Sequence, residues 1–177
     1  MSKEELVMEH LVSLHYAEPL APNLERFADA IVDGKLIGHL CPSCKRVYLP
    51  PKGYCPLCTV PTGETDEVEV GDHGTVTGFT IITPVAYYGQ TETQPFVYAS
   101  VKLDGVDSNL SGQDVVGIPH EDIHMGLRVR ARWAPAGERS TEGISNRGWG
   151  GLTGAIEAFE PTGEPDADYD SYKEHIF

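Results

Sequence analysis

Four cysteines, arranged in two pairs, are the residues of this chain with the most evident chemistry. Cys41 and Cys44 form one C-x-x-C pair, and Cys55 and Cys58 form a second pair after ten intervening residues. Each C-x-x-C turn presents two thiolates to one side, so two facing turns supply four sulfur ligands at the corners of a tetrahedron. Such a closed site is typical of structural zinc, although iron fits the same geometry. We therefore predict a structural zinc ion with no open position at which it could activate water.

The residues that follow the two pairs also bear on this site. Many zinc-binding turns carry glycine directly after the second cysteine, whereas this chain has Lys45 and Thr59 there. We expect a strained or modified turn at both positions, with the metal site retained. A redox pair of the thioredoxin kind is the competing interpretation, but it needs a single C-x-x-C in a βαβ setting. Two pairs flanked by short strands do not offer that setting.

The segment from His120 to His124 matches the H-E-x-x-H pattern of zinc proteases. In those enzymes the pattern lies on a long helix, and both histidines bind the metal. Here Pro119 precedes the pattern and Gly126 follows it closely, which leaves room for little more than one helical turn. No third ligand follows at a suitable spacing. We predict a surface turn between two strands, and a stand-alone enzyme that uses His124 remains the alternative.

Other catalytic motifs are missing from the sequence. It contains no G-x-S-x-G, no P-loop and no G-x-G-x-x-G motif. All four cysteines are assigned to the metal, so no thiol remains as a nucleophile. A thiolase-type reaction could not be carried out by this chain alone, and we predict no catalytic residue.

Three arginines form the main cationic cluster. Arg128, Arg130 and Arg132 alternate with apolar residues between Leu127 and Trp133, so one face of that strand is apolar and the other carries three positive charges. One interpretation is a solvated face that the acidic tail balances. The other is a binding patch for an anion, such as the phosphates of coenzyme A, or for an acidic partner.

Two further segments are candidate contacts with a partner protein. A long glycine-rich loop contains Arg147 and Trp149, and the acidic tail from Pro161 contains Tyr172 and Phe177. Aromatic residues on loops of small residues are common interface hot spots. Trp149 could equally fill a gap in the core. We predict that the loop and the tail contact the partner.

Net charge limits the classes of ligand. The 177 residues carry a formal net charge of -14, with an isoelectric point near 4.7. Nucleic-acid binders and proteins on anionic membranes normally show a basic surface, which this composition does not favour. The sequence contains no apolar run of about 18 residues, so it predicts no membrane span. The N-terminal MSKEELVMEH lacks the pattern of a signal peptide. We expect a cytoplasmic protein, a setting in which four cysteines are more often metal ligands than disulfides.

Hydrophobic periodicity predicts two helices followed by strands. The first helix runs from Ser2 to about Tyr16 and is either a frayed terminus, a docking helix or a linker remnant. The second begins after a cap at Asn23 and ends at Gly34. A short return strand at Arg46–Leu49 belongs to the cysteine module. The strands from Val68 onward fit a small barrel or sandwich; they are Val68–Val70, Thr75–Thr83, Phe96–Leu103, Val115–Ile118, Leu127–Trp133 and Leu152–Phe159.

These motifs together resemble one known family. The residues that carry the resemblance are Leu36–Cys44, Arg46–Pro51, Tyr54–Cys58, Gly74–Val76 and Gly126–Val129. They are similar to the acyl-CoA-associated zinc-ribbon/OB-fold proteins, known as domain of unknown function thirty-five. The cysteine module is the most specific part of the match.

The resemblance covers roughly Asn23 to Trp133 and implies a fold and a role. The fold would be mainly β: a helical segment at 1–34, a rubredoxin-like zinc ribbon at 35–64, an OB-fold barrel at 65–160 and a tail at 161–177. Proteins of this family typically pair with a thiolase-superfamily enzyme that holds the active site.

The resemblance therefore predicts a non-catalytic accessory subunit of an acyl-CoA thiolase or retro-aldolase. The subunit would stabilise a heteromeric complex and help to shape the acyl-CoA channel. Some members are fused to a hydratase fold in steroid side-chain degradation, where the partner is an aldolase. The alternative is an OB-fold protein that binds single-stranded nucleic acid, against which the net charge and the lack of a basic, aromatic surface pattern count.

Overall fold

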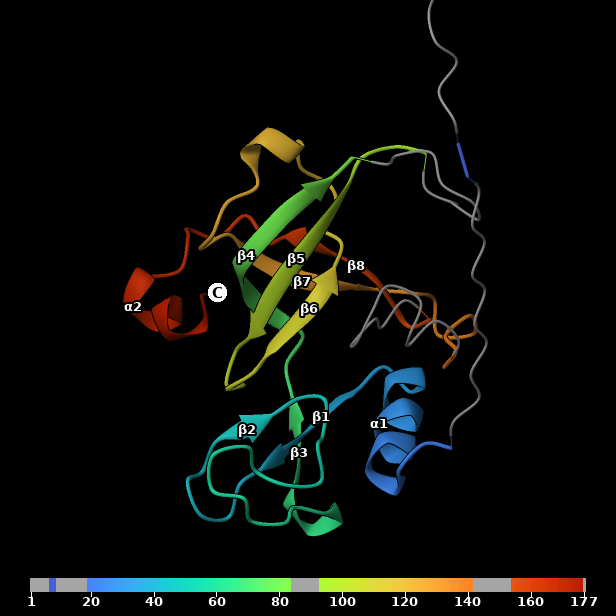
Figure 1. Ribbon diagram of the computed structural model, residues 1–177, viewed down its shortest axis with the longest axis vertical. Coiled ribbons are helices and arrows are strands. Elements are labelled where there is room, and N and C mark those ends of the chain that lie inside the picture. The colour runs from blue at the N-terminus through green and yellow to red at the C-terminus, as the bar shows by residue number, and fades with distance from the viewer. Residues whose placement is uncertain (1–6, 9–18, 84–92, 142–153, 177) are drawn as a thin grey trace, which may run out of the picture.

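The computed structural model of this chain describes residues 7–8, 19–83, 93–141 and 154–176. The strands within them are β1 (Leu36–Leu40), β2 (Val47–Tyr48), β3 (Glu67–Val70), β4 (His73–Ile82), β5 (Phe96–Leu103), β6 (Asn109–Gln113), β7 (Arg128–Trp133) and β8 (Ile156–Pro161). They form two antiparallel sheets, ordered β2-β1-β3 and β6-β5-β4-β7-β8 (Figure 1). The mainly β fold predicted from the sequence is confirmed.

Helices are few and short in the described residues. They are α1 (Pro22–Val32), α2 (Tyr169–Tyr172) and three 3-10 turns at Glu64–Asp66, His120–Asp122 and Lys173–His175. None of them is long and apolar enough to cross a membrane. The predicted helix from Ser2 to Tyr16 lies outside the described residues, apart from Val7 and Met8.

Helix α1 ends as predicted but begins differently. Gly34 adopts a φ of 80°, and its N–H donates to the carbonyl of Ile31, which is the C-terminal arrangement that favours glycine. At the other end the predicted cap at Asn23 is wrong. Pro22 occupies the first turn, which needs no N–H donor there, and the Asn23 amide donates to the carbonyl of Pro51 instead. This bond ties the helix to the cysteine module.

The strand predicted at Val115–Ile118 is also wrong, because this segment makes only a single bridge, from Val115 to Phe159 of β8. The bridge is reinforced by the N–H of Phe159, which donates to the carbonyl of Asp114. Since Asp114 directly follows β6 and β8 lies at the opposite end of the five-stranded sheet, the bridge joins the two outer strands. It closes the sheet into a barrel.

One hydrophobic core holds the parts together. Phe27 and Ile31 of α1 and Leu49 after β2 belong to the same buried cluster as Val76 and Phe159 of the barrel. The small sheet and the barrel therefore share the main core, and a second, small buried cluster lies around Cys41, Tyr48 and Cys55. Strand β3, which the predicted boundaries assign to the barrel, pairs with β1 in the small sheet. The division of the chain into domains at those boundaries stays a prediction.

Hydrogen bonds also join the small sheet to the turn between β5 and β6. The N–H of Val47 donates to the Asp107 carboxylate at 2.9 Å, and the N–H of Asp107 returns a bond to the Val47 carbonyl at 2.7 Å. Ser108 Oγ accepts from the N–H of Leu49 and donates to its carbonyl. The short strand β2 is thus held between β1 and the barrel.

Candidate metal centre

The two cysteine pairs fold into turns with the same hydrogen bonds. In the first turn, the N–H of Cys44 donates to Cys41 Sγ at 3.4 Å, and the N–H of Lys45 donates to the Cys41 carbonyl at 3.0 Å. In the second turn, Cys58 and Thr59 make the equivalent bonds to Cys55, at 3.4 and 2.9 Å. The N–H groups of Cys44 and Cys58 point at sulfur, so they stabilise thiolates, the form that binds metal.

Both turns need a left-handed residue at their end. Lys45 has a φ of 62° and Thr59 a φ of 56°, and they are the only non-glycine residues with positive φ in the described part of the chain. The expectation of strain at these two positions is confirmed. A β-branched threonine is especially costly in this conformation. A strained backbone kept at matching positions of both turns indicates that the ligand geometry, rather than local preference, fixes their shape.

The four sulfur atoms lie in one cluster. All the Sγ atoms of Cys41, Cys44, Cys55 and Cys58 are within 4.8 Å of one another. The Sγ atoms of Cys44 and Cys55 are 3.7 Å apart, close to the separation of about 3.8 Å that a tetrahedron with zinc–sulfur bonds of about 2.3 Å requires. Cys41 and Cys55 are fully buried. The residues present therefore fit a tetrahedral zinc ion, and the predicted structural zinc site is confirmed.

Thiol ionisation is uneven across this cluster. Burial opposes ionisation of Cys55, but N–H groups of Cys58 and Leu57 and the neighbouring sulfurs outweigh it and lower the pKa of this thiol to about 6. For Cys44 a backbone bond from Arg46 favours the thiolate, yet burial and the other three sulfurs raise its pKa to about 12. Four adjacent thiolates repel one another, so a cation among them favours the ionised form of the ligand set.

The arginine triplet is already paired with carboxylates. Arg128, whose side chain is 17% exposed, donates to both oxygens of Asp104 at 2.8 and 2.6 Å. It also donates to Thr75 Oγ1 at 2.9 Å and contacts Glu164 of the tail at 3.4 Å. These bonds hold the pKa of Asp104 below its ordinary value. Arg128 therefore joins β7, the turn after β5 and the C-terminal tail.

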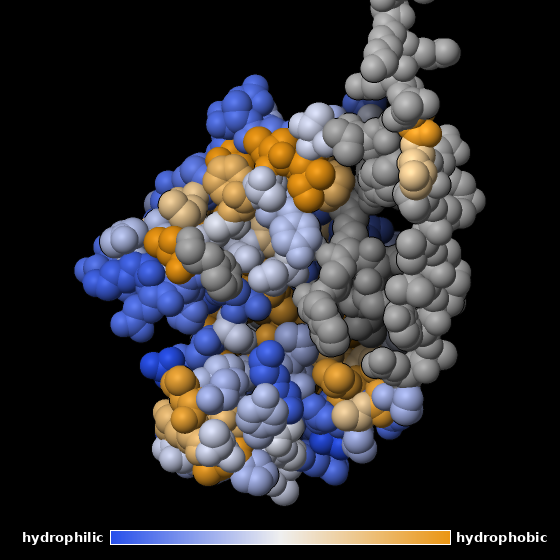
Figure 2. Space-filling model, in the orientation of Figure 1, coloured by the Kyte–Doolittle hydropathy of each residue, from blue (hydrophilic) through white to orange (hydrophobic). Residues whose placement is uncertain are grey.

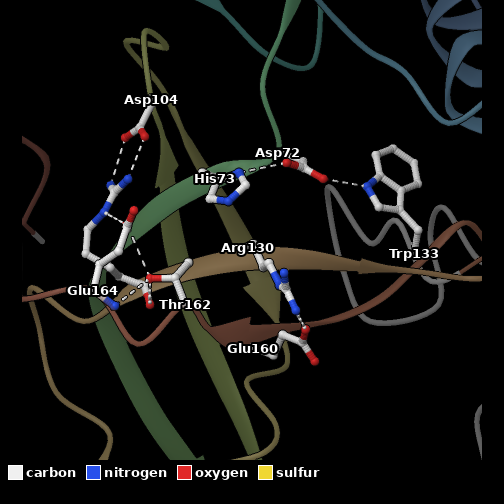
Figure 3. Close-up of polar contacts among 9 residues, drawn as sticks. Asp72, His73, Asp104, Arg130, Trp133, Glu160, Thr162 and Glu164 are labelled. Carbon is white, nitrogen blue, oxygen red and sulfur yellow. Dashed lines mark hydrogen bonds and ion pairs between the residues drawn. The ribbon is translucent and has the colours of Figure 1, made fainter.

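The other two arginines pair with strand β8. Arg130 donates twice to Glu160, at 2.9 and 2.7 Å (Figure 3), and Arg132 lies 3.2 Å from Glu157. Their side chains are 55% and 46% exposed. These contacts agree with the interpretation of a solvated strand face whose positive charges are balanced by acidic residues. The balancing acids come from β8 as well as from the tail. Binding of coenzyme A by the triplet stays a prediction.

A second polar cluster lies beside Arg130, and the sequence pattern did not single it out. The carboxylate of Asp72 accepts from His73 Nδ1 and from Trp133 Nε1, both at 2.9 Å (Figure 3). The guanidinium of Arg139 stacks over the Trp133 ring at 5.1 Å. Because Asp72 precedes β4 and Trp133 ends β7, this contact fixes how the two strands meet.

The segment that matches H-E-x-x-H is a surface turn, as predicted. Residues His120–Asp122 form one 3-10 turn with no buried residue. The ring of His124 contacts the Asp122 carbonyl at 2.7 Å and the Asp166 carboxylate at 2.9 Å. One ring nitrogen is thus bonded within its own turn and the other holds the C-terminal tail. His120 does not join His124 in any cluster of potential metal ligands found in the described residues.

These contacts give tail docking a pH dependence. The bonds to the Asp122 carbonyl and to Asp166 raise the pKa of His124 above its ordinary value. A group with a raised folded-state pKa contributes stability that is complete below its unfolded pKa, about 6.5, and is lost as pH rises through the folded value. We therefore expect the tail to be held more firmly at about pH 6 than at about pH 8.

Amide hydrogen exchange at Ala167, whose N–H donates to the Gly126 carbonyl at 2.9 Å, measures this effect. After correction for intrinsic rates, protection at Ala167 should fall as pH rises in the unmodified chain. In His124→Gln the protection should be lower and independent of pH over the same range. An unchanged pH profile in the variant would show that another group controls the tail.

The predicted partner contacts fall in different places. Tyr172 is only 7% exposed and packs against Gly126, with its ring edge-to-face on Tyr169. Its ring is therefore buried within this chain. Arg147, Trp149 and Phe177 lie outside the described residues.

Known proteins match this arrangement over both modules. Residues 28–61 match the family described as the rubredoxin-like zinc ribbon domain of ChsH2, and residues 67–134 match the family described as the C-terminal OB-fold domain of ChsH2. Together the two matches span more than half of the chain. A DUF35 domain-containing scaffold protein of Methanocaldococcus jannaschii is 29% identical over 114 residues, which cover 64% of this chain and 78% of that protein.

Two solved structures have a similar fold. A DUF35-family protein of unknown function from Sulfolobus solfataricus aligns with a TM-score of 0.52 and 24% identity, over 68% of this chain and 80% of that one. A chain of the Ltp2-ChsH2(DUF35) aldolase aligns with a TM-score of 0.55 and 21% identity, over 82% of this chain and 98% of that one. At such low identity these likenesses bear on the fold alone.

Proposed function

Because the chain belongs to the family of ChsH2-type zinc-ribbon and OB-fold proteins, we propose that it is a non-catalytic subunit of an acyl-CoA enzyme of the thiolase superfamily. That enzyme is a thiolase or a retro-aldolase, and the other subunit of the complex holds the active site. A closed four-sulfur site is the observation that carries the non-catalytic part of the proposal, since all four cysteines are committed to it. The description of one relative as a scaffold protein supports the accessory role, and the fold of this chain is that of a chain in the Ltp2-ChsH2(DUF35) aldolase.

The described residues also support the proposal by what they lack. Their arginines on β7 are paired with carboxylates, and the histidine of the H-E-x-x-H segment holds the tail. Within these residues we find no second cluster of metal ligands, and the His39 ring that lies 2.9 Å from Thr62 Oγ1 is buried, away from any substrate. The substrate class we propose is a steroid acyl-CoA whose side chain the partner cleaves by retro-aldol chemistry, in the cytoplasm.

Capture from an extract of the source cell tests the role. The full chain, carrying an affinity tag, should retain a thiolase-superfamily protein that mass spectrometry identifies. The recovered complex should cleave an acyl-CoA ester, whereas the chain alone should show no turnover. Steroid acyl-CoA and short 3-ketoacyl-CoA thioesters, assayed side by side, distinguish retro-aldol from thiolytic cleavage. Activity confined to the short thioesters would remove the steroid proposal.

Two outcomes would overturn the accessory role itself. Turnover by the isolated chain, abolished in His124→Ala, would make it an enzyme. Binding of single-stranded DNA with a strong salt dependence would favour the nucleic-acid alternative, because such binding releases counterions from phosphates. The chain with His120→Ala serves as the matched control for the first outcome, since both histidines belong to the same surface segment.

A further inference from the structure

Strand β4 has an open edge along its second half. Only residues His73–Thr75 of β4 pair with β7, and one further residue, Val76, bonds to the backbone of Leu127 and Gly126. Beyond a bulge at Val76/Gly78, β4 pairs within the described residues on one side only, with β5. This distal part of the β4–β5 hairpin projects from the barrel (Figure 1). An unpaired strand edge is a template on which another strand can form hydrogen bonds.

Apolar side chains gather at the same place. Phe79 and Ile81 of β4 are 38% and 40% exposed, and Met125, beside the strand edge, is 46% exposed. Figure 2 shows hydrophobic surface over this end of the hairpin. A hollow of about 440 Å³ lies on it, lined by Phe79, Met125 and the pairs Gly78–Ser100 and Thr80–Tyr98. The surface thus combines a free backbone edge with an adjacent pocket.

This part of the chain is almost uncharged. From Gly74 to Val101 the sequence has a single charged residue, Glu92, although the whole chain carries 40 acidic and basic residues and a net charge of -14. No residue that lines the hollow is charged. The surface therefore has no cation with which to bind a phosphate or an acidic peptide, and it suits an uncharged, apolar occupant.

Charge also decides between two possible occupants. A second copy of this chain would bring two molecules of net charge -14 together without a compensating cation at the contact. A partner without the same large negative charge avoids this repulsion. An extended segment is the form that can pair with a strand edge while its alternate side chains enter a pocket. We propose that the distal β4–β5 hairpin docks an extended, apolar and uncharged segment of the partner enzyme, by strand addition at β4. This inference rests on the proposed function and adds the surface that carries it.

Gly78 offers a direct test. A Cβ atom at Gly78 would meet no atom within 4 Å, and its φ lies outside the left-handed region, so a larger side chain is accepted without strain and fills the hollow. Gly71, before β4, has the same freedom but lies outside the hollow, which makes Gly71→Leu the matched control. Gly78→Leu should weaken binding of the captured partner by about tenfold or more, and Gly71→Leu by less than about twofold.

A second variant guards against an indirect effect of the first. Ile81→Thr keeps a β-branched residue on the strand but removes apolar surface, and it too should weaken binding. Zinc content and melting temperature, measured on all three variants, should match those of the unmodified chain. Partner affinity equal to the control in both Gly78→Leu and Ile81→Thr would overturn the proposal.

The experiment separates this inference from the proposed function. If the unmodified chain captures no thiolase-superfamily protein, the proposed function fails and the docking surface fails with it. If the unmodified chain captures that protein and Gly78→Leu does so equally well, only the docking surface fails. A self-associated chain that becomes monomeric in Gly78→Leu would make a second copy the occupant and would also overturn the proposal.

Discussion

Cys55→Ser should release the metal and unfold the cysteine module while the barrel stays largely folded. A structural zinc ion contributes of the order of 10 kcal/mol to the folding of a small domain, and serine is a poor replacement for a buried thiolate ligand. Apart from Leu36 and Leu49, which pack in the main core, the module has little else to hold it, since β2 is two residues long and the local buried cluster consists of Cys41, Tyr48 and Cys55. Metal analysis of the purified chain should fall from about one zinc per molecule to a small fraction.

Ser43→Ala is the matched control for this variant. Ser43 lies in the first cysteine turn but is exposed and has no hydrogen bond to the cluster. Its replacement should leave metal content and the thermal transition unchanged. Full zinc occupancy in Cys55→Ser would contradict the four-sulfur site. Recovery of iron instead of zinc from the unmodified chain would keep the site and change its metal.

Arg128→Met should lower the free energy of unfolding by about 2 kcal/mol, as measured by urea denaturation. The side chain is mostly buried, and its removal leaves Asp104 without the guanidinium that holds its pKa low. It also breaks the link from β7 to Glu164 of the tail. Methionine preserves most of the volume, so the loss is mainly that of charge-assisted hydrogen bonds. A cost below about 0.5 kcal/mol would show that these bonds only compensate the desolvation of the charge.

Arg130→Met is the control, and it also tests coenzyme A binding. Its guanidinium is 55% exposed and pairs with Glu160 on the surface, a contact of roughly 0–1 kcal/mol. Stability should therefore be close to that of the unmodified chain. If the triplet binds the phosphates of an acyl-CoA, the KM of the assembled complex for that acyl-CoA should be higher with Arg130→Met than with the unmodified chain. An unchanged KM would show that Arg130 does not bind coenzyme A.

Local sequence was sufficient for the metal site and for the strands with clear alternation. The C-x-x-C spacing brings both thiols of a pair to one side of a short turn, and Phe96–Leu103 alternates so regularly that its strand was predicted with the right bounds. Strand β6 was missed because its sequence, NLSGQ, is polar. It becomes a strand through its pairing with β5, where Leu110 faces Val101. Tertiary pairing overrode a weak local preference.

Contacts between distant residues could not be predicted in the same way. Asp104 lies 24 residues from Arg128, and Glu160 lies 30 residues from Arg130. Nothing in the local pattern identifies which acid will face which arginine. The burial of Tyr172 has the same cause, since it depends on the tail returning to Gly126. The sequence reported the chemistry of these side chains but not their partners.

The bonds between β2 and the turn at Asp107 and Ser108 have a consequence for the order of assembly. That turn follows β5 at the base of the hairpin whose distal end we propose as the docking surface, and it is bonded to the two-residue strand β2 of the metal-binding module and to Leu49 after it. In a chain without metal, the contacts that β2 makes with this turn would be weakened, and the hairpin would be held less firmly. Metal loading should therefore precede subunit association, so that zinc supply sets how much of the chain is competent to join its enzyme.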